Sequence, residues 1–229
     1  MKFYALKVYD IEESIVASGL PMKKRKYTPE EFEWEVDNLG NYLKFEKQIF
    51  EDAKLPKEER DLKSENHRKA INHIRRVCNL GSAKPNSGHD CALKGIVVNV
   101  NIEANQSFWL QWERYHHQDT ISSMSTMHCL TKFEKLDEMF SKNVDPRNIA
   151  ILNEKIEEYN NNPTMDNFEK VIDNCPQGIE LCRRVTLNYL QIKTMLEQRK
   201  NHKMSSWRED FVRIAGQLPY FKEFTQGLN

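Results

Sequence analysis

The stretch Ser107–His128, SFWLQWERYHHQDTISSMSTMH, carries most of the information on the fold of this chain. Its first half predicts a helix over residues 105–117, because apolar and aromatic side chains recur there at helical spacing. On such a helix Gln111 and Arg114 lie three residues apart on a shared face, so both can reach one ligand. The aromatic residues that set the spacing are Phe108, Trp109, Trp112 and Tyr115.

The second half of the stretch mixes short polar and β-branched residues in period two, which predicts a strand or an extended loop with hydroxyl groups facing one side. Hydroxyl groups beside an arginine suit a phosphate, so we expect an anion site where Arg114 meets Ser123 and Ser125. The alternating sets are Thr120, Ser122 and Met124 on one side, and Ile121, Ser123 and Ser125 on the other.

Arg114 and the tryptophans also have structural interpretations. Arg114 can form a surface ion pair with Glu113 or Asp119 instead of binding a ligand. Trp109 and Trp112 fit a hydrophobic core better than a stacking platform.

The histidines and Ser125 leave several roles open. His116 and His117 would point to opposite sides of an extended chain, so we expect no metal site. His128 is either a proton donor or a core residue that forms hydrogen bonds. Ser125 has no evident base, which favours a hydrogen-bonding role over a covalent one.

Length and composition exclude several classes of protein. The 229 residues suit one domain, and the formal net charge is zero although 30% of the residues are charged. We therefore expect no polymeric nucleic acid and no anionic membrane as a partner. No apolar run is long enough to span a bilayer, and the start, MKFYALKV, is too interrupted for a signal peptide, so a cytoplasmic protein is expected. The five cysteines are an odd number without Cys-x-x-Cys spacing and are expected to be reduced.

Hydrophobic periodicity and turn residues predict the remaining elements. The second amphipathic helix is highly charged, and its histidines, His67 and His73, are expected at the surface. The segment Gly81–His89 is the clearest loop, and no glycine motif of the Rossmann or P-loop type occurs. The expected helices are 10–17, 28–50 with a weak point near Gly40, 57–79, 131–140, 148–159 and 164–173, and the expected strands are 2–9 and 93–102.

Gln111, followed by Arg114-Tyr115-His116 and then Ser125, resembles the signature of the flavin-dependent thymidylate synthases. In that family a Gln precedes Arg-His-Arg, and a Ser follows after seven residues. Here Tyr115 and His116 replace the His and the second Arg, and eight residues separate His116 from Ser125. Gly88-His89 is similar to a loop of the family, but the Glu-His pair that comes next there falls at Lys94-Gly95.

The C-terminal third resembles the second conserved region of the same family. Asn188 ends a Thr-x-Asn strand, and Arg199 ends a Leu-x-x-Arg helix at the family's spacing. Thr194 stands where the family has an Asn in that helix. The other matching positions are Pro176-Gln-Gly178, Trp207 and Pro219.

The resemblance implies an α+β fold with a small mixed or antiparallel sheet and a helical layer, in which residues 57–80 would be a helical insertion. It implies a homotetramer with sites between subunits, dUMP as substrate, and FAD, NADPH and methylenetetrahydrofolate as cofactors. Arg199 and Ser125 would be catalytic. The substrate would be bound by Gln111, Arg114, Ser123, Ser125 and Arg199, and the cofactor by His89, Arg114, Tyr115, His116, Asn188 and Thr194.

The function implied is transfer of a one-carbon unit to C5 of a pyrimidine deoxynucleotide, as methylation or as a variant such as hydroxymethylation. Two alternatives remain: a nucleotide-binding member without flavin chemistry, and a structural or partner-binding helical protein.

Overall fold

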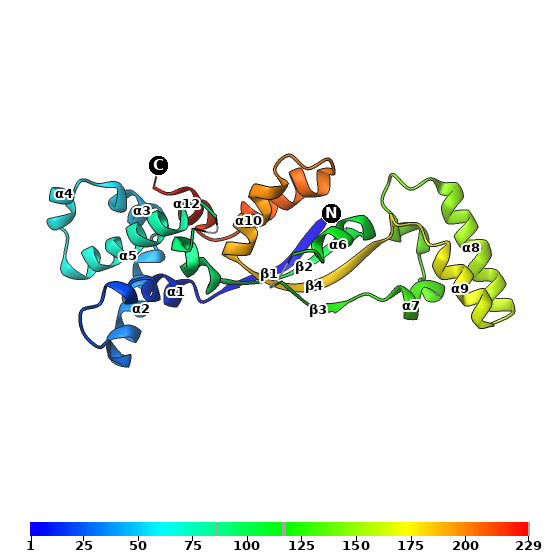
Figure 1. Ribbon diagram of the computed structural model, residues 1–229, viewed down its shortest axis with the longest axis horizontal. Coiled ribbons are helices and arrows are strands. Elements are labelled where there is room, and N and C mark those ends of the chain that lie inside the picture. Colours follow the sequence, from blue (N-terminus) through cyan, green and yellow to red (C-terminus); the bar gives the residue numbers. More distant parts are fainter. Residues whose placement is uncertain (86, 116–117, 229) are drawn as a thin grey trace. The chain divides into compact units, whose positions relative to one another are not determined.

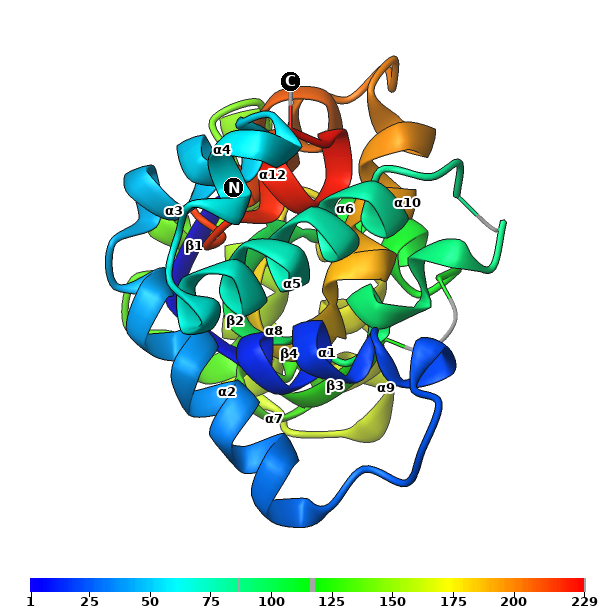
Figure 2. The same ribbon diagram turned by 90° about the vertical axis from the view of Figure 1, so that its left-hand side faces the viewer.

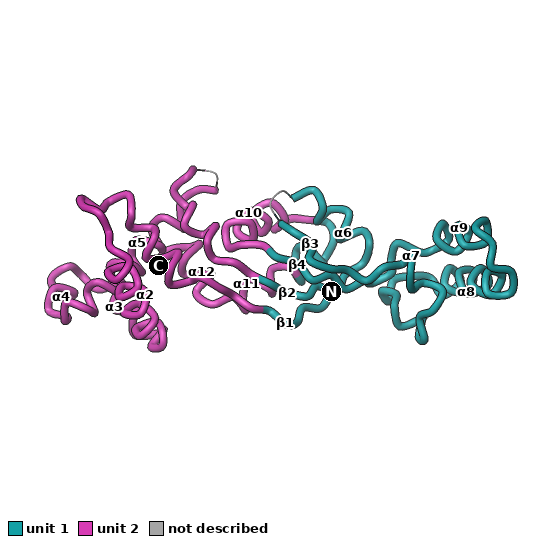
Figure 3. Tube along the Cα trace, turned by 90° about the horizontal axis from the view of Figure 1, so that it is seen from below, with its two compact units in different colours: residues 1–6, 99–186, 203–210 teal, residues 7–98, 187–202, 211–229 magenta. Residues whose placement is uncertain are grey.

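The computed structural model describes residues 1–85, 87–115 and 118–228 (Figures 1 and 2). The chain separates into two compact units (Figure 3). Unit 1 comprises residues 1–6, 99–186 and 203–210, and unit 2 comprises residues 7–98, 187–202 and 211–229. The single domain expected from the chain length stays a prediction.

Unit 1 is built on a four-stranded antiparallel sheet with the strand order β1-β2-β4-β3. One face of β2 is apolar, because Val98, Val100 and Ile102 are at most 1% exposed while the residues between them are half-buried. β2 begins later than expected, since the residues before it form a 3₁₀-helix. The strands are β1 (Lys2–Tyr9), β2 (Val97–Asn105), β3 (Asp119–Ser123) and β4 (Glu180–Asn188).

Helix α6 (Gln106–Trp112) contributes three aromatic side chains to a core of unit 1. Phe108, Trp109 and Trp112 are fully buried, and the Phe108 ring stacks on Trp207 with 4.3 Å between the ring centroids. The indole N–H of Trp109 donates to two backbone carbonyls, at 3.0 and 3.1 Å, so its polar group is satisfied inside the core. The prediction that Trp109 and Trp112 are core residues is therefore confirmed.

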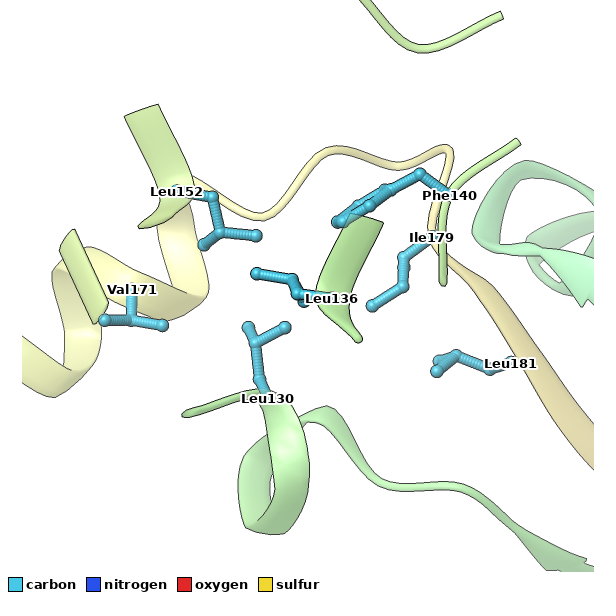
Figure 4. Packing of buried hydrophobic residues seen from close by; sticks show 7 residues of the cluster. All are labelled: Leu130, Leu136, Phe140, Leu152, Val171, Ile179 and Leu181. Atoms are coloured by element: carbon cyan, nitrogen blue, oxygen red, sulfur yellow. The ribbon is translucent and has the colours of Figure 1, made fainter. Parts of the chain in front are cut away.

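A second hydrophobic core of unit 1 lies beside α8 (Pro146–Asn161) and α9 (Met165–Asp173), which pack against each other (Figures 1 and 4). Asp145 and Thr164 cap these helices through their side chains, so the start of each lies close to where the sequence places it. The buried members of this core are Leu130, Leu136, Phe140, Leu152, Val171, Ile179 and Leu181.

The helix expected over residues 131–140 is wrong. The segment forms two short 3₁₀-helices, η3 (Leu130–Lys132) and η4 (Leu136–Met139), and it comes after α7 (Thr126–Cys129). On one continuous helix Leu130 would face away from Leu136. The irregular backbone instead brings both side chains into the second core (Figure 4).

Unit 2 is a helical unit arranged around α5 (Glu65–Gly81), which packs against α1, α2, α3 and α12 (Figure 2). The apolar stripe expected on this segment is confirmed, since Ile71, Ile74 and Val77 are fully buried. The other helices of unit 2 are α1 (Ile11–Ala17), η1 (Leu20–Met22), α2 (Pro29–Leu43), α3 (Glu46–Lys54), α4 (Lys57–Asp61), η2 (His89–Lys94), α10 (Tyr189–Arg199), α11 (Val212–Ala215) and α12 (Phe221–Gln226).

Two long helices expected in unit 2 are each divided into two. The helix expected over 28–50 breaks at Lys44–Phe45 and not near Gly40. The helix expected over 57–79 breaks before Ser64, whose hydroxyl accepts a hydrogen bond from the His67 N–H and so caps a new helix. The Ser64 cap therefore decided a boundary inside a charged segment that periodicity did not reveal.

No helix of the described residues is long and apolar enough to cross a bilayer. The five cysteines are free thiols, and burial raises the pKa of the Cys78 thiol to about 12.

Candidate functional site

The signature segment of unit 1 begins on α6, which Asn105 caps by accepting a hydrogen bond from the Phe108 N–H at 2.9 Å. The expected extent of this helix to residue 117 is wrong, because α6 ends at Trp112. Gln111 is on its last turn, where its amide N–H donates to Ser107 O at 3.3 Å. Arg114 comes after the helix and is connected to Gln111 by a backbone hydrogen bond of 3.4 Å. The two residues are therefore neighbours, although they do not share a helix face.

Arg114 is exposed, and in the part of the chain that the structure describes its side chain forms no hydrogen bond or ion pair. The ion pair considered for it with Glu113 is wrong, because Glu113 pairs with Arg183 instead, with 2.7 Å between Oε1 and Nη1. The Arg183 guanidinium also lies 4.5 Å from the centre of the Trp109 ring. All the hydrogen-bond donors of the Arg114 guanidinium thus remain available to an anion.

Arg183 was not anticipated from the sequence. It lies on β4, and strand pairing places it opposite Ser123 of β3. An arginine 70 positions from its glutamate partner gives no local signal, because Glu113 comes directly after α6 and only the fold brings it to β4.

The serines lie on and after the edge strand β3. Its pairing with β4 is irregular between Thr120 and Ser122, which pair with Val185 and Arg184 respectively. Neighbouring residues of β4 point to opposite faces, so Thr120 and Ser122 do too, and the prediction of hydroxyl groups on one side is wrong. The physical cause is a β-bulge at Ile121.

Ser125 caps α7 by accepting a hydrogen bond from the His128 N–H at 3.3 Å. This contact agrees with the preference for a hydrogen-bonding role. Ser123 is exposed on β3. His128 is also exposed, which overturns the alternative of a core histidine and leaves the role of proton donor as a prediction.

Tyr115 is half-buried in unit 1, with its ring centroid 6.0 Å from that of Trp207. It therefore lies against the aromatic core. The adjacent candidate His116, together with His117, lies outside the described residues.

The candidate residues of unit 2 lie on α10 and η2, which pack against each other. Asn188 caps α10 in a reciprocal arrangement with Gln191, with hydrogen bonds of 3.0 and 2.8 Å. The Thr194 hydroxyl donates to Leu190 O at 2.9 Å. Arg199 is half-buried at the end of the helix, and His89 is exposed at the start of η2.

A buried lysine on α10 is the second feature that was not anticipated. Lys193 is 9% exposed, and its ammonium lies 2.8 Å from Asp90 Oδ2. It also donates to the carbonyls of Gly81 and Ala83, at 2.8 and 2.5 Å. A single lysine inside a helical pattern gives no sequence sign of such contacts, because its partners are about a hundred residues away along the chain.

Gly95 replaces the histidine of the family's Glu-His pair. A Cβ at this position would lie 2.2 Å from the hydroxyl oxygen of Ser14, which is itself buried. A side chain at position 95 therefore requires the buried Ser14 side chain to move. The site of this family contact is therefore closed by packing in addition to being substituted.

His73 has a structural role in unit 2, and its expected surface position is wrong because it is only 5% exposed. Its Nε2 lies 2.9 Å from Glu35 of α2, and its Nδ1 lies 2.5 Å from Arg76. Burial, together with the charge of Arg76, lowers the pKa of His73 to about 4. A neutral ring that donates from Nε2 and accepts at Nδ1 satisfies both contacts.

A cavity of about 680 Å³ in unit 2 lies between α10, α11, α12 and the chain after α5. Its lining includes Ser82, Lys193, Glu197 and Lys222, but none of the candidate site residues. Within the described ranges, no three His, Cys, Asp or Glu side chains gather as metal ligands would.

Among the comparisons with known proteins, only the comparison with solved structures finds a match, and it concerns the fold alone. No family model and no curated protein matches the sequence. Two crystal structures of the flavin-dependent thymidylate synthase ThyX from Helicobacter pylori, both with FAD and dUMP, match with TM-scores of 0.61 and 0.62. Each match covers 98% of this chain and 97% of the ThyX chain at 11% identity. The α+β fold and the resemblance expected from the motifs are thus confirmed: the chain is ThyX-like in fold and strongly divergent from ThyX in sequence.

Proposed function

We propose that this chain is a thymidylate-synthase-like enzyme that transfers a one-carbon unit from methylenetetrahydrofolate to C5 of a pyrimidine deoxynucleotide, with dUMP as the leading candidate. The observation that carries the proposal is the match in fold over 98% of the chain to enzymes crystallised with FAD and dUMP. Motif residues found without that match, Gln111, Arg114, Asn188 and Arg199, add independent support.

The nucleotide would be held through its phosphate and its base. Arg114 supports this role because its guanidinium is exposed and permanently charged, and Ser123 and Ser125 supply hydroxyl groups on and beside the adjacent strand. Arg199 of unit 2 would meet the base or sugar side. Gln111 would bind the substrate next to Arg114. In this proposal Arg199 and Ser125 are the catalytic residues, and the sites form between subunits of a homotetramer in the cytoplasm.

The fit of this chain to FAD is partial. His89 and Arg114 are exposed and can donate hydrogen bonds, which supports a cofactor site. The side-chain oxygen of Asn188, however, is engaged in the cap of α10, and a side chain at position 95 would meet the Ser14 hydroxyl. Bound flavin would supply the hydride that reduces the transferred carbon. NADPH would then resupply the hydride to the flavin. Tyr115, His116 and Thr194 would complete the cofactor contacts, and we expect binding to be weaker than in enzymes that keep the Glu-His pair.

The packing around Gly95 also favours a second candidate function, in which the chain binds a pyrimidine nucleotide without flavin chemistry. The two candidates differ in a property that is simple to measure. The absorbance spectrum of the purified protein reports bound flavin, and calorimetric titration with dUMP, with and without added FAD, reports nucleotide binding.

Flavin absorbance together with dUMP binding would support the enzyme. dUMP binding without any affinity for flavin would select the second candidate. No affinity for any pyrimidine nucleotide, with or without FAD, would refute both and leave a structural or partner-binding protein. Light scattering that gives a monomer at micromolar concentration would count against composite sites in a homotetramer.

A further inference from the structure

The buried Lys193 joins three segments of unit 2 that are far apart in the sequence. Its side chain extends from α10 to the C-terminal end of α5 and to the first turn of η2. All three protons of the ammonium group have an acceptor within 2.8 Å, two of them backbone carbonyls and one the Asp90 carboxylate. Asp90 is 1% exposed and Lys193 is 9% exposed, so the carboxylate is closed to solvent while the lysine side chain lies at the wall of the cavity described above.

The backbone acceptors explain why a cation is placed here. Gly81 is the last residue of α5, and the last carbonyls of a helix have no partner within the helix. A positive charge at this end also interacts favourably with the helix dipole. The C-terminal end of α5 is also closely packed on α12, because a Cβ on Gly81 would lie 2.3 Å from Phe224 O. Lys193 therefore attaches α10 to a rigid part of unit 2.

Asp90 connects Lys193 to the turn that carries a candidate cofactor residue, His89. It comes directly after His89 at the start of η2, and Gly95, packed on Ser14, holds the other end of the segment. Without the Lys193 contact, the turn that carries His89 would keep its packed end at Gly95 and lose this ion pair to α10. Of the polar contacts described for Asp90, the one to Lys193 is the one that connects this turn to α10.

We propose that Lys193, through Asp90, is a positioning residue that holds the first turn of η2, which carries the exposed His89, on α10 and so pre-organises the cofactor site. The inference rests on the proposed function, since it presumes that His89 and α10 contact the flavin. If the substitution lowers the population of the binding-competent arrangement to about a tenth, the apparent affinity for FAD falls about tenfold, because the dissociation constant scales with the inverse of that population.

The test compares three variants of the full chain. Lys193→Met removes the charge and keeps a long side chain, and Asp90→Asn keeps an acceptor for the ammonium group. Asp52→Asn is the matched control, because Asp52 is also a buried carboxylate that pairs with a lysine: its side chain is 4% exposed and lies 3.0 Å from Lys63. Asp52 is on α3 and is not part of η2 or α10. For each variant we would measure the unfolding midpoint, amide hydrogen exchange in residues 87–91, and the dissociation constant for FAD by fluorescence.

We expect Lys193→Met to accelerate exchange in residues 87–91 and to weaken FAD binding by about tenfold, with a smaller effect for Asp90→Asn. Asp52→Asn should lower the unfolding midpoint and leave both the exchange and the FAD affinity within about twofold of wild type. Equal loss of FAD affinity in Asp52→Asn and Lys193→Met would overturn the proposal in favour of general destabilisation. Unchanged exchange in Lys193→Met would overturn it as well. Wild-type protein with no affinity for FAD would refute the flavin part of the proposed function and the cofactor role of Lys193 together, whereas a loss confined to Lys193→Met and Asp90→Asn would support both.

Discussion

Replacing Arg114 with alanine separates a binding role from a structural one, because the side chain is exposed and forms no hydrogen bond or ion pair within the described residues. The free energy of unfolding should therefore change by less than about 0.5 kcal/mol, the usual range for a surface substitution without contacts. A guanidinium that donates to a phosphate contributes roughly 1.5–3 kcal/mol to binding. The substitution should then raise the Kd for dUMP by roughly 10- to 150-fold.

The assay is calorimetric titration with dUMP in the presence of FAD, after circular dichroism and urea unfolding have shown that each variant is folded. Arg147→Ala is the matched control in the same unit. Arg147 is 88% exposed and pairs with Asp145 at 2.6 Å, so its loss removes an ordinary surface ion pair of less than about 1 kcal/mol. The control should bind dUMP like wild type. If Arg114→Ala also binds dUMP within twofold of wild type, the reasoning from the exposed guanidinium is refuted.

Three further predictions concern stability. Leu152→Ala, at a fully buried position of the second core, should lower the free energy of unfolding by about 2–5 kcal/mol in urea, and a loss below about 1 kcal/mol would contradict the packing of that core. Gly95→Ala should cost about 1–3 kcal/mol because its Cβ meets the Ser14 hydroxyl, and Ser14→Gly in the same chain should restore part of this loss if the contact is the cause. The pKa of His73 is lowered in the folded protein from 6.5 to about 4, so the unfolded chain binds the extra proton first. The free energy of unfolding should therefore fall by roughly 3 kcal/mol in total as the pH drops from about 6.5 towards 4. His73→Gln should lose this pH dependence, and a wild-type unfolding midpoint that is equal at pH 7 and pH 5 would exclude the role of His73.

The sequence predicted those elements whose signals are local. β1 has the bounds that its alternation predicts, and α9 begins directly after the Thr164 cap. Where tertiary contacts decide, prediction was wrong: α6 stops at Trp112 although aromatic residues continue at helical spacing, and His73 is buried because Glu35 and Arg76 satisfy its ring.

The candidate site shows the same division. Motif spacing was sufficient to select Arg114, Asn188 and Arg199, because each keeps its place relative to a recognisable neighbour. Arg183 and Lys193 could not be found in this way, since their ionic partners are 70 and 103 residues away and only the folded chain brings them together.

The bulge at Ile121 shows how a strand can contain one additional residue while the residues after it keep their pairing. The signature of the flavin-dependent thymidylate synthases has seven residues before its serine, and this chain has eight before Ser125. A bulge places two residues of one strand opposite one residue of its partner, so it accommodates one additional residue locally. Beyond the bulge Ser122 and Ser123 pair with Arg184 and Arg183, so one additional residue at this point would not shift the segment that leads to Ser125. An edge strand thus tolerates a length change that a central strand, paired on both sides, would pass on to its neighbours.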